Sequence, residues 1–257
     1  MRIATWNVNS LNARMERVDE WLALAAPDVV CLQETKMSDE QFPHDHFAQL
    51  GYQSAHSGEG RWNGVALLSR SPIDDVRTDF ADDRDPDPEA RLISGRIDGV
   101  SVTSVYVPNG RAVDDDHYHY KLDWLGRLRT HVEAIAAPTD DVVVAGDFNI
   151  APEDRDVWDV AKTSGGTHVT EPERAALARL SEWGLEDVFR RHHDDDGLFS
   201  WWDYRGGAFH KREGMRIDLV MGSASIAQAS TFALVDRNAR KGTQPSDHAP
   251  VFIDVAR

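Results

Sequence analysis

Two patterns of hydrophobic and polar residues alternate along the chain. Short runs of small or β-branched residues, such as Val142–Ala145, are typical of strands buried on both faces. Longer segments such as Ala13–Ala25 and His117–Ile135 carry apolar residues three or four positions apart, which is typical of amphipathic helices. Alternating residues on both sides of Asp98-Gly99 predict a hairpin. The chain therefore combines crossover helices with antiparallel strands.

The same patterns locate the other elements. Strands are predicted at Arg2–Asn9, Asp28–Leu32, Tyr52–Ser57, Gly64–Ser69, Ile73–Thr78, Arg91–Ile97, Val100–Val107, Val142–Ala145, Arg216–Met221, Thr231–Val235 and Val251–Val255. Helices are predicted at Ala13–Ala25, Phe42–Leu50, His117–Ile135 and Glu171–Trp183, and a polar irregular loop at Glu153–Thr170. The strands form two sets, each with hairpins and a helical crossover. This favours an α/β fold of two mixed sheets packed face to face and covered by helices over one doubly wound parallel sheet.

Composition limits the class of protein. The chain has 257 residues, of which 41% are hydrophobic, and no Pro/Gly/Ser-rich linker divides it, so we expect a single domain over residues 1–257. The single cysteine, Cys31, lies in an apolar run and excludes both a disulfide framework and a cysteine-rich zinc site. No apolar stretch approaches the length of a membrane span, and the first residues lack a signal-peptide profile. We expect a cytoplasmic protein that has no membrane partner.

The net charge of −16 does not by itself favour a nucleic acid as partner, because proteins that bind nucleic acids usually show a basic footprint. The acidic residues are concentrated in Asp79–Asp87, Asp114–Asp116 and Asp194–Asp196, which read as solvated loops. Positive charge is concentrated in Arg205–Arg216 and Arg237–Lys241. The distribution of charge on the surface therefore decides whether a polyanion can bind.

Polar residues of the types that take part in catalysis or metal binding recur at the predicted strand ends, where α/β proteins bind their ligands. They are Asn7, Glu34, Tyr106, Asp147, Asn149, Asp218, Asp247 and His248. Strand geometry places Asp147 and Asn149 on one face and Phe148 on the other. Taken singly, each also fits a structural role: a turn at Asp147 or Asn7, a helix cap at Glu34, a packed aromatic at Tyr106. Their recurrence favours a common site.

The residue types in this set indicate the chemistry. Carboxylates are hard oxygen ligands that suit Mg²⁺ or Mn²⁺. No H-E-x-x-H zinc motif, no Walker motif and no G-x-S-x-G elbow occurs in the chain. What remains is metal-assisted hydrolysis with a histidine, an acid and a tyrosine, which suits a phosphodiester because charge develops on the phosphate oxygens.

Eight motifs in order then give the chain a family resemblance. They are Trp6-Asn7-Val8-Asn9, Leu32-Gln33-Glu34-Thr35-Lys36, Asn63-Gly64-Val65-Ala66, Tyr106-Val107-Pro108-Asn109-Gly110, Gly146-Asp147-Phe148-Asn149, Trp201-Trp202-Asp203-Tyr204-Arg205, Arg216-Ile217-Asp218 and Ser246-Asp247-His248-Ala249-Pro250. The chain resembles the exonuclease III family of the endonuclease/exonuclease/phosphatase superfamily from Arg2 to about Val255. The resemblance implies a four-layer α/β sandwich of the DNase I-like type. It also implies a Mg²⁺-dependent DNA repair nuclease that cuts duplex DNA 5′ to abasic sites, degrades it from 3′ ends and cleans 3′ termini.

The resemblance also implies roles for individual residues. Glu34 would be the principal metal ligand, with Asn7 beside it, and Asp147 would position and deprotonate the attacking water with help from Asn149. His248, oriented by Asp218, would donate to the scissile phosphate, and Tyr106 would contact a phosphate oxygen or the leaving group. Asp247 would touch a second metal position, and the implied metal set of Asn7, Glu34, Asp147, Asn149, Asp247 and His248 leaves one or two metal ions open.

Substrate contacts are implied in the same way. Asn9, Asn109 and Arg111 would bind phosphates, Trp202 would lie in the pocket for the abasic sugar, and Arg205 would contact the DNA backbone. The alternative for Trp202 is a place in the core. We expect a monomer, because duplex DNA needs one open face.

Two other functions remain to be weighed. A phosphatase or phosphodiesterase of the same superfamily, acting on a small phosphoester, would share the Glu, Asp-x-Asn and Asp-His elements but should lack Trp201–Arg205 and Asn63–Ala66. A catalytically dead DNA-binding or scaffold protein would have lost an acid or the histidine, and none is lost here.

Overall fold

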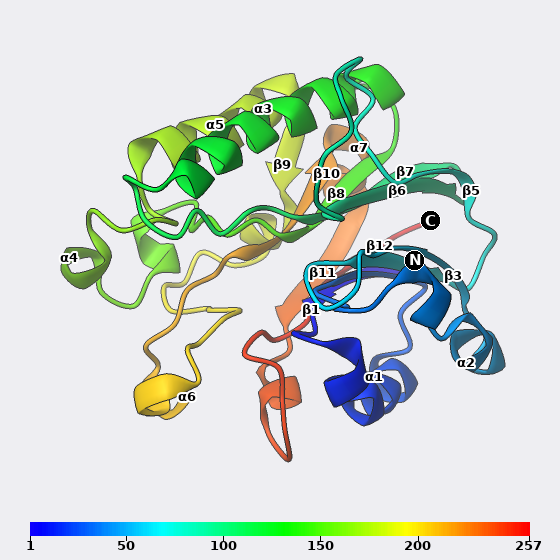
Figure 1. The fold of residues 1–257 in the computed structure, drawn as a ribbon, viewed down its shortest axis with the longest axis horizontal. Coiled ribbons are helices and arrows are strands. Elements are labelled where there is room, and N and C mark those ends of the chain that lie inside the picture. The colour runs from blue at the N-terminus through cyan, green and yellow to red at the C-terminus, as the bar shows by residue number, and fades with distance from the viewer.

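The computed structural model describes residues 1–257 as two β-sheets that lie face to face between two layers of helices. Figure 1 shows the four layers edge on, with α3 (Asp116–Ile135) and α5 (Glu171–Trp183) at the top and the N-terminal helices at the bottom. The prediction of two packed mixed sheets flanked by helices is confirmed. None of the helices combines the length and the apolar composition that a bilayer span requires.

Each sheet has six strands. The first contains β1 (Arg2–Asn7), β2 (Val29–Gln33), β3 (Gln53–Ser57), β4 (Val65–Ser69), β11 (Ser230–Val235) and β12 (Val251–Val255). The second contains β5 (Asp74–Arg77), β6 (Leu92–Ile97), β7 (Val100–Tyr106), β8 (Val142–Asp147), β9 (Leu185–Asp187) and β10 (Asp218–Ser223). The strand orders are β11-β12-β1-β2-β4-β3 and β5-β6-β7-β8-β10-β9. Only β1 with β2 and β7 with β8 pair in parallel, so the two sheets repeat one plan.

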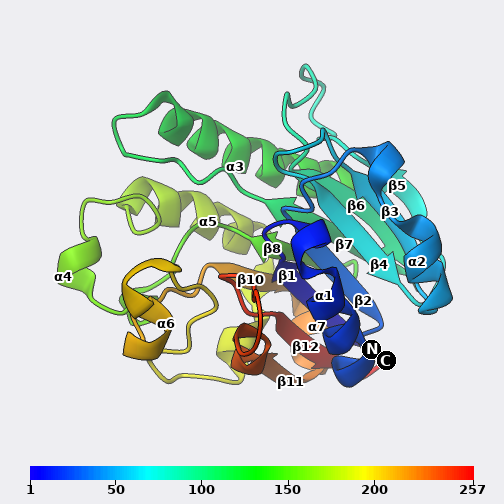
Figure 2. The same cartoon turned by 60° about the horizontal axis from the view of Figure 1, so that its bottom comes forward.

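The helices connect and cover these sheets. They are α1 (Leu11–Ala25), α2 (His44–Gln49), α3 (Asp116–Ile135), α4 (Val160–Thr163), α5 (Glu171–Trp183), α6 (Ala208–Lys211) and α7 (Ala224–Ala229). Helices α3 and α5 cover the outer face of the second sheet, and α1 and α2 cover that of the first (Figures 1 and 2). Helices α4, α6 and α7 were not predicted, because four to six residues are too few to show a helical period.

Alternation along the central strands explains how each sheet buries both faces. In β2, Val29 and Cys31 lie in the core between the two sheets, whereas Val30 and Leu32 lie in the core against the N-terminal helices. The predicted strand Val142–Ala145 in β8 divides in the same way, between the central core and the core beneath α3 and α5. Successive side chains of a strand point to opposite faces, so a strand with helices on one side and a sheet on the other must be apolar throughout.

The topology brings six strand ends to one edge. The carboxyl ends of β1 and β2 and those of β7 and β8 lie at this edge, and the antiparallel neighbours β12 and β10 begin there. Gly146 lets β8 approach β7 closely, because a Cβ at this position would lie 1.9 Å from the carbonyl oxygen of Val105. Asp147 and Asp218 are register partners across β8 and β10. Polar residues from distant parts of the chain therefore meet at this edge.

Candidate active site

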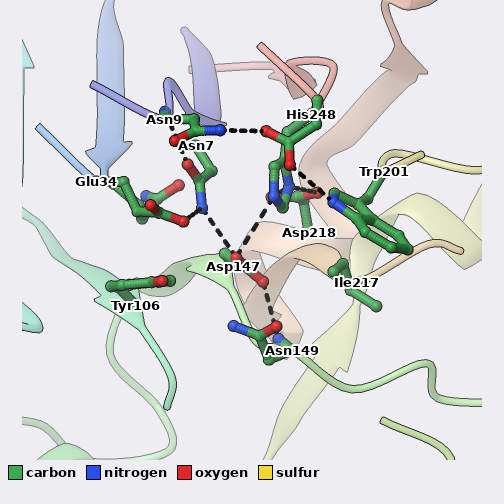
Figure 3. Close-up of polar contacts among 12 residues, drawn as sticks. Asn7, Asn9, Glu34, Tyr106, Asp147, Asn149, Trp201, Ile217, Asp218 and His248 are labelled. Atoms are coloured by element: carbon green, nitrogen blue, oxygen red, sulfur yellow. Dashed lines mark hydrogen bonds and ion pairs between the residues drawn. The ribbon is translucent and has the colours of Figure 1, made fainter. Parts of the chain in front are cut away.

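Asp147 lies at the centre of the group of polar side chains at this edge (Figure 3). It ends β8 and is buried, with 1% of its surface exposed. Asn7 and Tyr106 end β1 and β7, and Glu34 follows β2, while Asp218 and His248 enter from the opposite direction at the starts of β10 and β12. Phe148 points the other way into the core beneath α3 and α5, as the alternation predicts.

Glu34 and Asp147 form an acidic pair with Asn7 between them. The Asn7 Nδ2 donates to Glu34 Oε1 and to Asp147 Oδ2, each at 2.9 Å. Burial raises the pKa of Asp147 to about 7, with the positive charge of His248 acting against it. On its outer side Glu34 Oε2 lies 2.7 Å from the Lys36 ammonium. The pair is thus a negative centre that already attracts one cation of the chain.

This arrangement fits a divalent metal ion. Ligand atoms of Glu34, Asp147 and His248 lie within 4.8 Å of one another, and the two carboxylates supply the hard oxygens that Mg²⁺ and Mn²⁺ prefer. The side-chain oxygen of Asn7 instead accepts from the backbone N–H of Asn9 at 3.0 Å, so Asn7 binds the carboxylates as a donor and presents no oxygen to a metal in this conformation. The predicted ligand role of Asn7 therefore requires its amide to turn.

His248 is held as a hydrogen-bond donor. Its Nδ1 lies 2.9 Å from Asp218 Oδ2, and Ser200 Oγ donates to the same carboxylate oxygen at 2.6 Å. Burial opposes a charge here, yet the charges of Asp218 and Asp147 outweigh it and raise the pKa of His248 to about 10. Its Nε2 lies 3.8 Å from Asp147 Oδ2. An imidazolium has no free lone pair, so this geometry favours donation to substrate over the predicted metal ligation.

The turn that carries Glu34 has an unusual backbone. Glu34 has a φ of 53°, in the left-handed region that costs a non-glycine residue roughly 1–2 kcal/mol. Its carbonyl oxygen accepts from the N–H of Ser10 at 2.7 Å, and the next N–H, of Thr35, donates to the carbonyl of Gly64 at 3.1 Å. A Cβ on Gly64 would lie 2.1 Å from Thr35 Oγ1. The motif Asn63–Ala66 therefore supports the Glu34 turn from the neighbouring strand.

A buried ion pair supports Asn149 on the other side of the site. Asn149 also has a left-handed φ, of 51°, and its N–H donates to Asp147 Oδ1 at 2.9 Å. Its carbonyl oxygen accepts from Lys121 Nζ at 2.6 Å and from His168 Nδ1 at 2.5 Å. Lys121 pairs with Glu173, and both side chains are completely buried. The side chain of Asn149 donates to the carbonyl of Val107, which ties it to the end of β7.

The walls of the catalytic pocket correct one prediction. The pocket has a volume of about 180 Å³ and is lined by Trp201, Ile217 and His168 in addition to the polar residues. Trp202 does not line it. Its ring has 1% of its surface exposed and packs against Phe209 in a small separate core. Neighbouring residues of an extended segment point in opposite directions, so the exposed member of the Trp-Trp pair is Trp201.

The other predicted residues differ in whether they line the catalytic pocket. Asp247 lines the pocket, and its oxygens accept from Asn9 Nδ2 at 3.0 Å and from Trp201 Nε1 at 3.1 Å. Asn109 lines both this pocket and an adjacent hollow of about 710 Å³ that also contains Arg111. The structure does not bring Arg205 into either hollow, because its side chain is 93% exposed and lies beside Asp203.

Sequence reasoning missed Lys121, His168, Trp201 as the pocket aromatic, and Ile217. His168 lies in the polar loop at Glu153–Thr170, where no periodicity guides a prediction. Lys121 occupies a polar position within a helix and reads as solvent-facing until the fold places it under Asn149. Ile217 precedes Asp218 and reads as an ordinary strand residue. Only the placement of Trp201 had an available signal, the strand-like alternation in Ser200-Trp201-Trp202.

The fold and the site together have the groups of a metal-assisted phosphoester hydrolase: two carboxylates for a cation and an Asp–His pair that donates. The family model described as "Endonuclease/Exonuclease/phosphatase family" matches residues 4–248. The chain belongs to this family.

Its relatives are nucleases or phosphatases by their names. The chain is 30% identical over 269 residues to the exodeoxyribonuclease III of Haemophilus influenzae, with 99% of each chain covered. Among solved structures it is similar to an AP endonuclease from Archaeoglobus fulgidus, with a TM-score of 0.96 and 34% identity, and to a 3′ phosphatase from Neisseria bound to a product DNA hairpin, with a TM-score of 0.95 and 37% identity. Both structures are covered completely, as is this chain.

Proposed function

We propose that this protein is a Mg²⁺-dependent DNA repair nuclease of the exodeoxyribonuclease III type. It hydrolyses phosphodiesters of duplex DNA 5′ to abasic sites and processes 3′ ends, and Mn²⁺ substitutes for Mg²⁺. The observation that carries the proposal is the position of Asp147, buried between the Glu34 carboxylate and the donor end of His248. A base and a positive donor, with Asp147 Oδ2 and His248 Nε2 3.8 Å apart, thus both line the catalytic pocket. The names of the relatives supply the substrate class.

Glu34 and Asp147 would hold the metal ion. A bound Mg²⁺ supplies positive charge to the phosphate oxygens, where negative charge grows in the transition state. The Lys36 ammonium, 2.7 Å from Glu34, supplies part of that charge from the chain itself. Both carboxylate oxygens of Asp247 accept hydrogen bonds from neutral donors, the side chains of Asn9 and Trp201. Its role at a second metal position therefore stays a prediction.

Asp147 would orient the attacking water and take its proton. A general base works best when its pKa is near the working pH, and burial raises that of Asp147 to about 7. The N–H of Asn149 and the amide of Asn7 fix the two oxygens of this carboxylate, so the base does not rotate.

His248 would donate from Nε2 to the phosphate, because Asp218 occupies its Nδ1. The buried Asp218 keeps the imidazole charged and in one orientation. Burial together with the Glu34 charge raises the pKa of Tyr106 well above its ordinary value, so the phenol keeps its proton and donates to a phosphate oxygen or to the leaving group.

The pocket supports a substrate with no base at the reacting nucleotide. Its volume of about 180 Å³ is below the range of roughly 300–1,000 Å³ found for sites of drug-sized ligands. A sugar-phosphate without a base, or a terminal phosphate, suits such a space. Extruding an unpaired damaged nucleotide from the duplex costs little free energy, because few stacking and pairing interactions are lost. Asn109 and Arg111 would contact phosphates in the adjacent hollow. We place the enzyme in the cytoplasm as a monomer, in line with its single buried, reduced cysteine.

The test uses two end-labelled duplexes, one with a single abasic-site analogue and one with a 3′ phosphate, each incubated with Mg²⁺ or with EDTA. We expect a Mg²⁺-dependent cut on the 5′ side of the lesion, and release of phosphate followed by trimming on the second duplex. Asp147→Asn is the matched inactive control. Intact duplexes, combined with phosphate release from a small phosphoester, would replace this proposal with the small-molecule phosphatase.

A further inference from the structure

A further hollow of about 430 Å³ is separate from the catalytic pocket and from the hollow that contains Arg111. One wall comes from Tyr204, Phe209 and His210 around α6, and the other from Arg240 and Lys241 in the loop before β12. In Figure 1 α6 and this red loop project on the same side of the molecule. None of these residues belongs to the catalytic group described above.

Arg240 is a buried cation with no acidic partner in this hollow. Only 7% of its surface is exposed, and it makes no ion pair with any carboxylate. Its Nη1 donates to the carbonyl of Ser246, and its Nε has no hydrogen-bond partner. Burying a guanidinium is unfavourable, and burial lowers the pKa of Arg240, with the charge of Asp247 acting against it from beyond ion-pair distance. The guanidinium also lies 5.0 Å from the centroid of Phe209 and 5.4 Å from that of Tyr204.

The surrounding charges are also positive. Lys241 lines the hollow, and its ammonium bonds only the neutral side chain of Asn238, at 2.8 Å. Arg237 lies 5.2 Å from the ring of Phe209 and makes no ion pair. The one acid in the lining, Asp203, already accepts from the backbone N–H of Arg205 at 2.8 Å. In a chain with a net charge of −16, such a group of unpaired cations is suited to an anion.

The hollow shares two segments with the catalytic pocket. Trp201 and Asp247 line the catalytic pocket, while Tyr204 and Pro245, three and two residues away along the same segments, line the hollow. The segments are joined by the bond from the Trp202 N–H to the Asp247 carbonyl, at 3.0 Å. Two or three residues span at most about 7–10 Å. Because only two or three residues separate the two sites along each segment, the hollow lies within a few nucleotides of the scissile phosphate on a bound strand.

We propose that Arg240 and Lys241 form a subsite for one backbone phosphate of the bound DNA, within a few nucleotides of the phosphodiester that is cleaved. The subsite rests on the proposed function and adds to it a determinant of substrate affinity. Arg240 binds the phosphate from a fixed position against the aromatic rings, and Lys241 binds it from the exposed side.

The test replaces single backbone phosphates by neutral methylphosphonates, one position at a time along the cleaved strand. For the wild-type enzyme we expect KM to rise about tenfold at one position near the predicted distance, as expected for loss of a hydrogen bond to a charged group. Lys241→Gln raises KM on unmodified DNA, leaves kcat near its normal value, and shows a smaller further rise at that one position than the wild type, because only Arg240 still binds the phosphate. In this variant the negative slope of log affinity against log salt concentration becomes shallower by about 0.9, because one phosphate contact is lost. Arg240→Gln repeats the result where it folds, and Lys241→Gln serves alone where it does not.

Arg179→Gln, an exposed position on α5 at the far side of the second sheet, is the matched control. The subsite is refuted if Lys241→Gln behaves like this control, or if the variant and the methylphosphonate have additive effects at every position. Inhibition by inorganic phosphate that depends on Lys241, with a KM that is the same for every methylphosphonate position, would show a free-phosphate site. That result would also overturn the proposal. Failure of the wild-type enzyme to cleave any DNA would instead contradict the proposed function.

Discussion

Replacing Lys121 by methionine removes a charge from a place that water does not reach. Lys121 and Glu173 are both completely buried, and the ammonium also donates to the carbonyl of Asn149. Although burial acts to raise the pKa of Glu173, the charge and hydrogen bond of Lys121 lower it, so the carboxylate is ionised in the native protein. Lys121→Met keeps the length of the side chain and leaves this carboxylate with only its neutral donors, the N–H groups of His168 and Thr170 and the Thr170 hydroxyl.

The expected cost follows from the burial of the pair. Breaking a buried ion pair by removing one partner costs about 3–5 kcal/mol. With a urea dependence of roughly 3 kcal/mol per M, the unfolding midpoint falls by about 1–1.7 M. The double variant Lys121→Met/Glu173→Gln removes the unpaired charge and keeps an acceptor for the Thr170 cap, so we expect it to recover at least half of the loss.

The assay is urea unfolding of the wild-type, single and double variants, followed by tryptophan fluorescence. Turnover is measured on the folded protein, where loss of the Lys121 donor to Asn149 should reduce kcat by about tenfold or more in both variants, since small displacements in a catalytic site are costly. A loss of stability below about 1 kcal/mol in the single variant would refute the reasoning, which requires an uncompensated buried charge. A double variant as unstable as the single one would refute it equally.

Three further predictions, which use four substitutions, test the site and the fold. Asp147→Asn should lower single-turnover cleavage by about 10³-fold while the affinity for DNA in a gel-shift assay stays within twofold, and retained cleavage would remove Asp147 from its role. Trp201→Ala should raise KM for abasic DNA, whereas Trp202→Phe should lower the melting temperature with little change in KM; the reverse pattern would contradict the pocket. Burial lowers the pKa of His131 to about 4, so it is neutral when folded and takes up a proton below about pH 6.5 when unfolded. Stability should therefore fall by about 2 kcal/mol more between pH 7 and 5 in the wild type than in His131→Gln, measured by urea unfolding, and equal losses would exclude the effect.

The structure shows which charged residues of this acidic chain form ion pairs and which do not. Some acidic residues of Asp79–Asp87 have a structural role. Arg127 of α3 is buried, and its Nε donates to Asp82 Oδ2 at 2.6 Å. Arg216, at the end of the basic stretch Arg205–Arg216, is fully buried between Asp156 and Asp187. Arg237, Arg240 and Lys241, in contrast, make no ion pair. Sequence reasoning located both basic stretches but did not show which of their residues face the solvent, because ion pairing depends on long-range contacts.

Alternation of apolar residues determined the strands and the long helices, since burial on one or both faces is a local demand on each segment. Polar residues at strand ends were recognisable for the same reason: Asp147 and Asn149 interrupt a pattern that the buried run before them establishes. The short helices escaped this reasoning, as did the boundaries of loops, because their conformation follows from contacts rather than from a period.

The sequence by itself thus determined the two mixed sheets, the family motifs and the residue types of the site. Only the tertiary structure decided which groups meet and in what state: that Asn7 donates to both carboxylates, that Trp201 rather than Trp202 lines the pocket, that Lys121 lies beneath Asn149, and that Arg240 is left without an acid. The physical reason is that hydrophobic periodicity acts between neighbours in the chain, whereas hydrogen-bond partners, burial and pKa depend on residues brought together from the whole length of the chain.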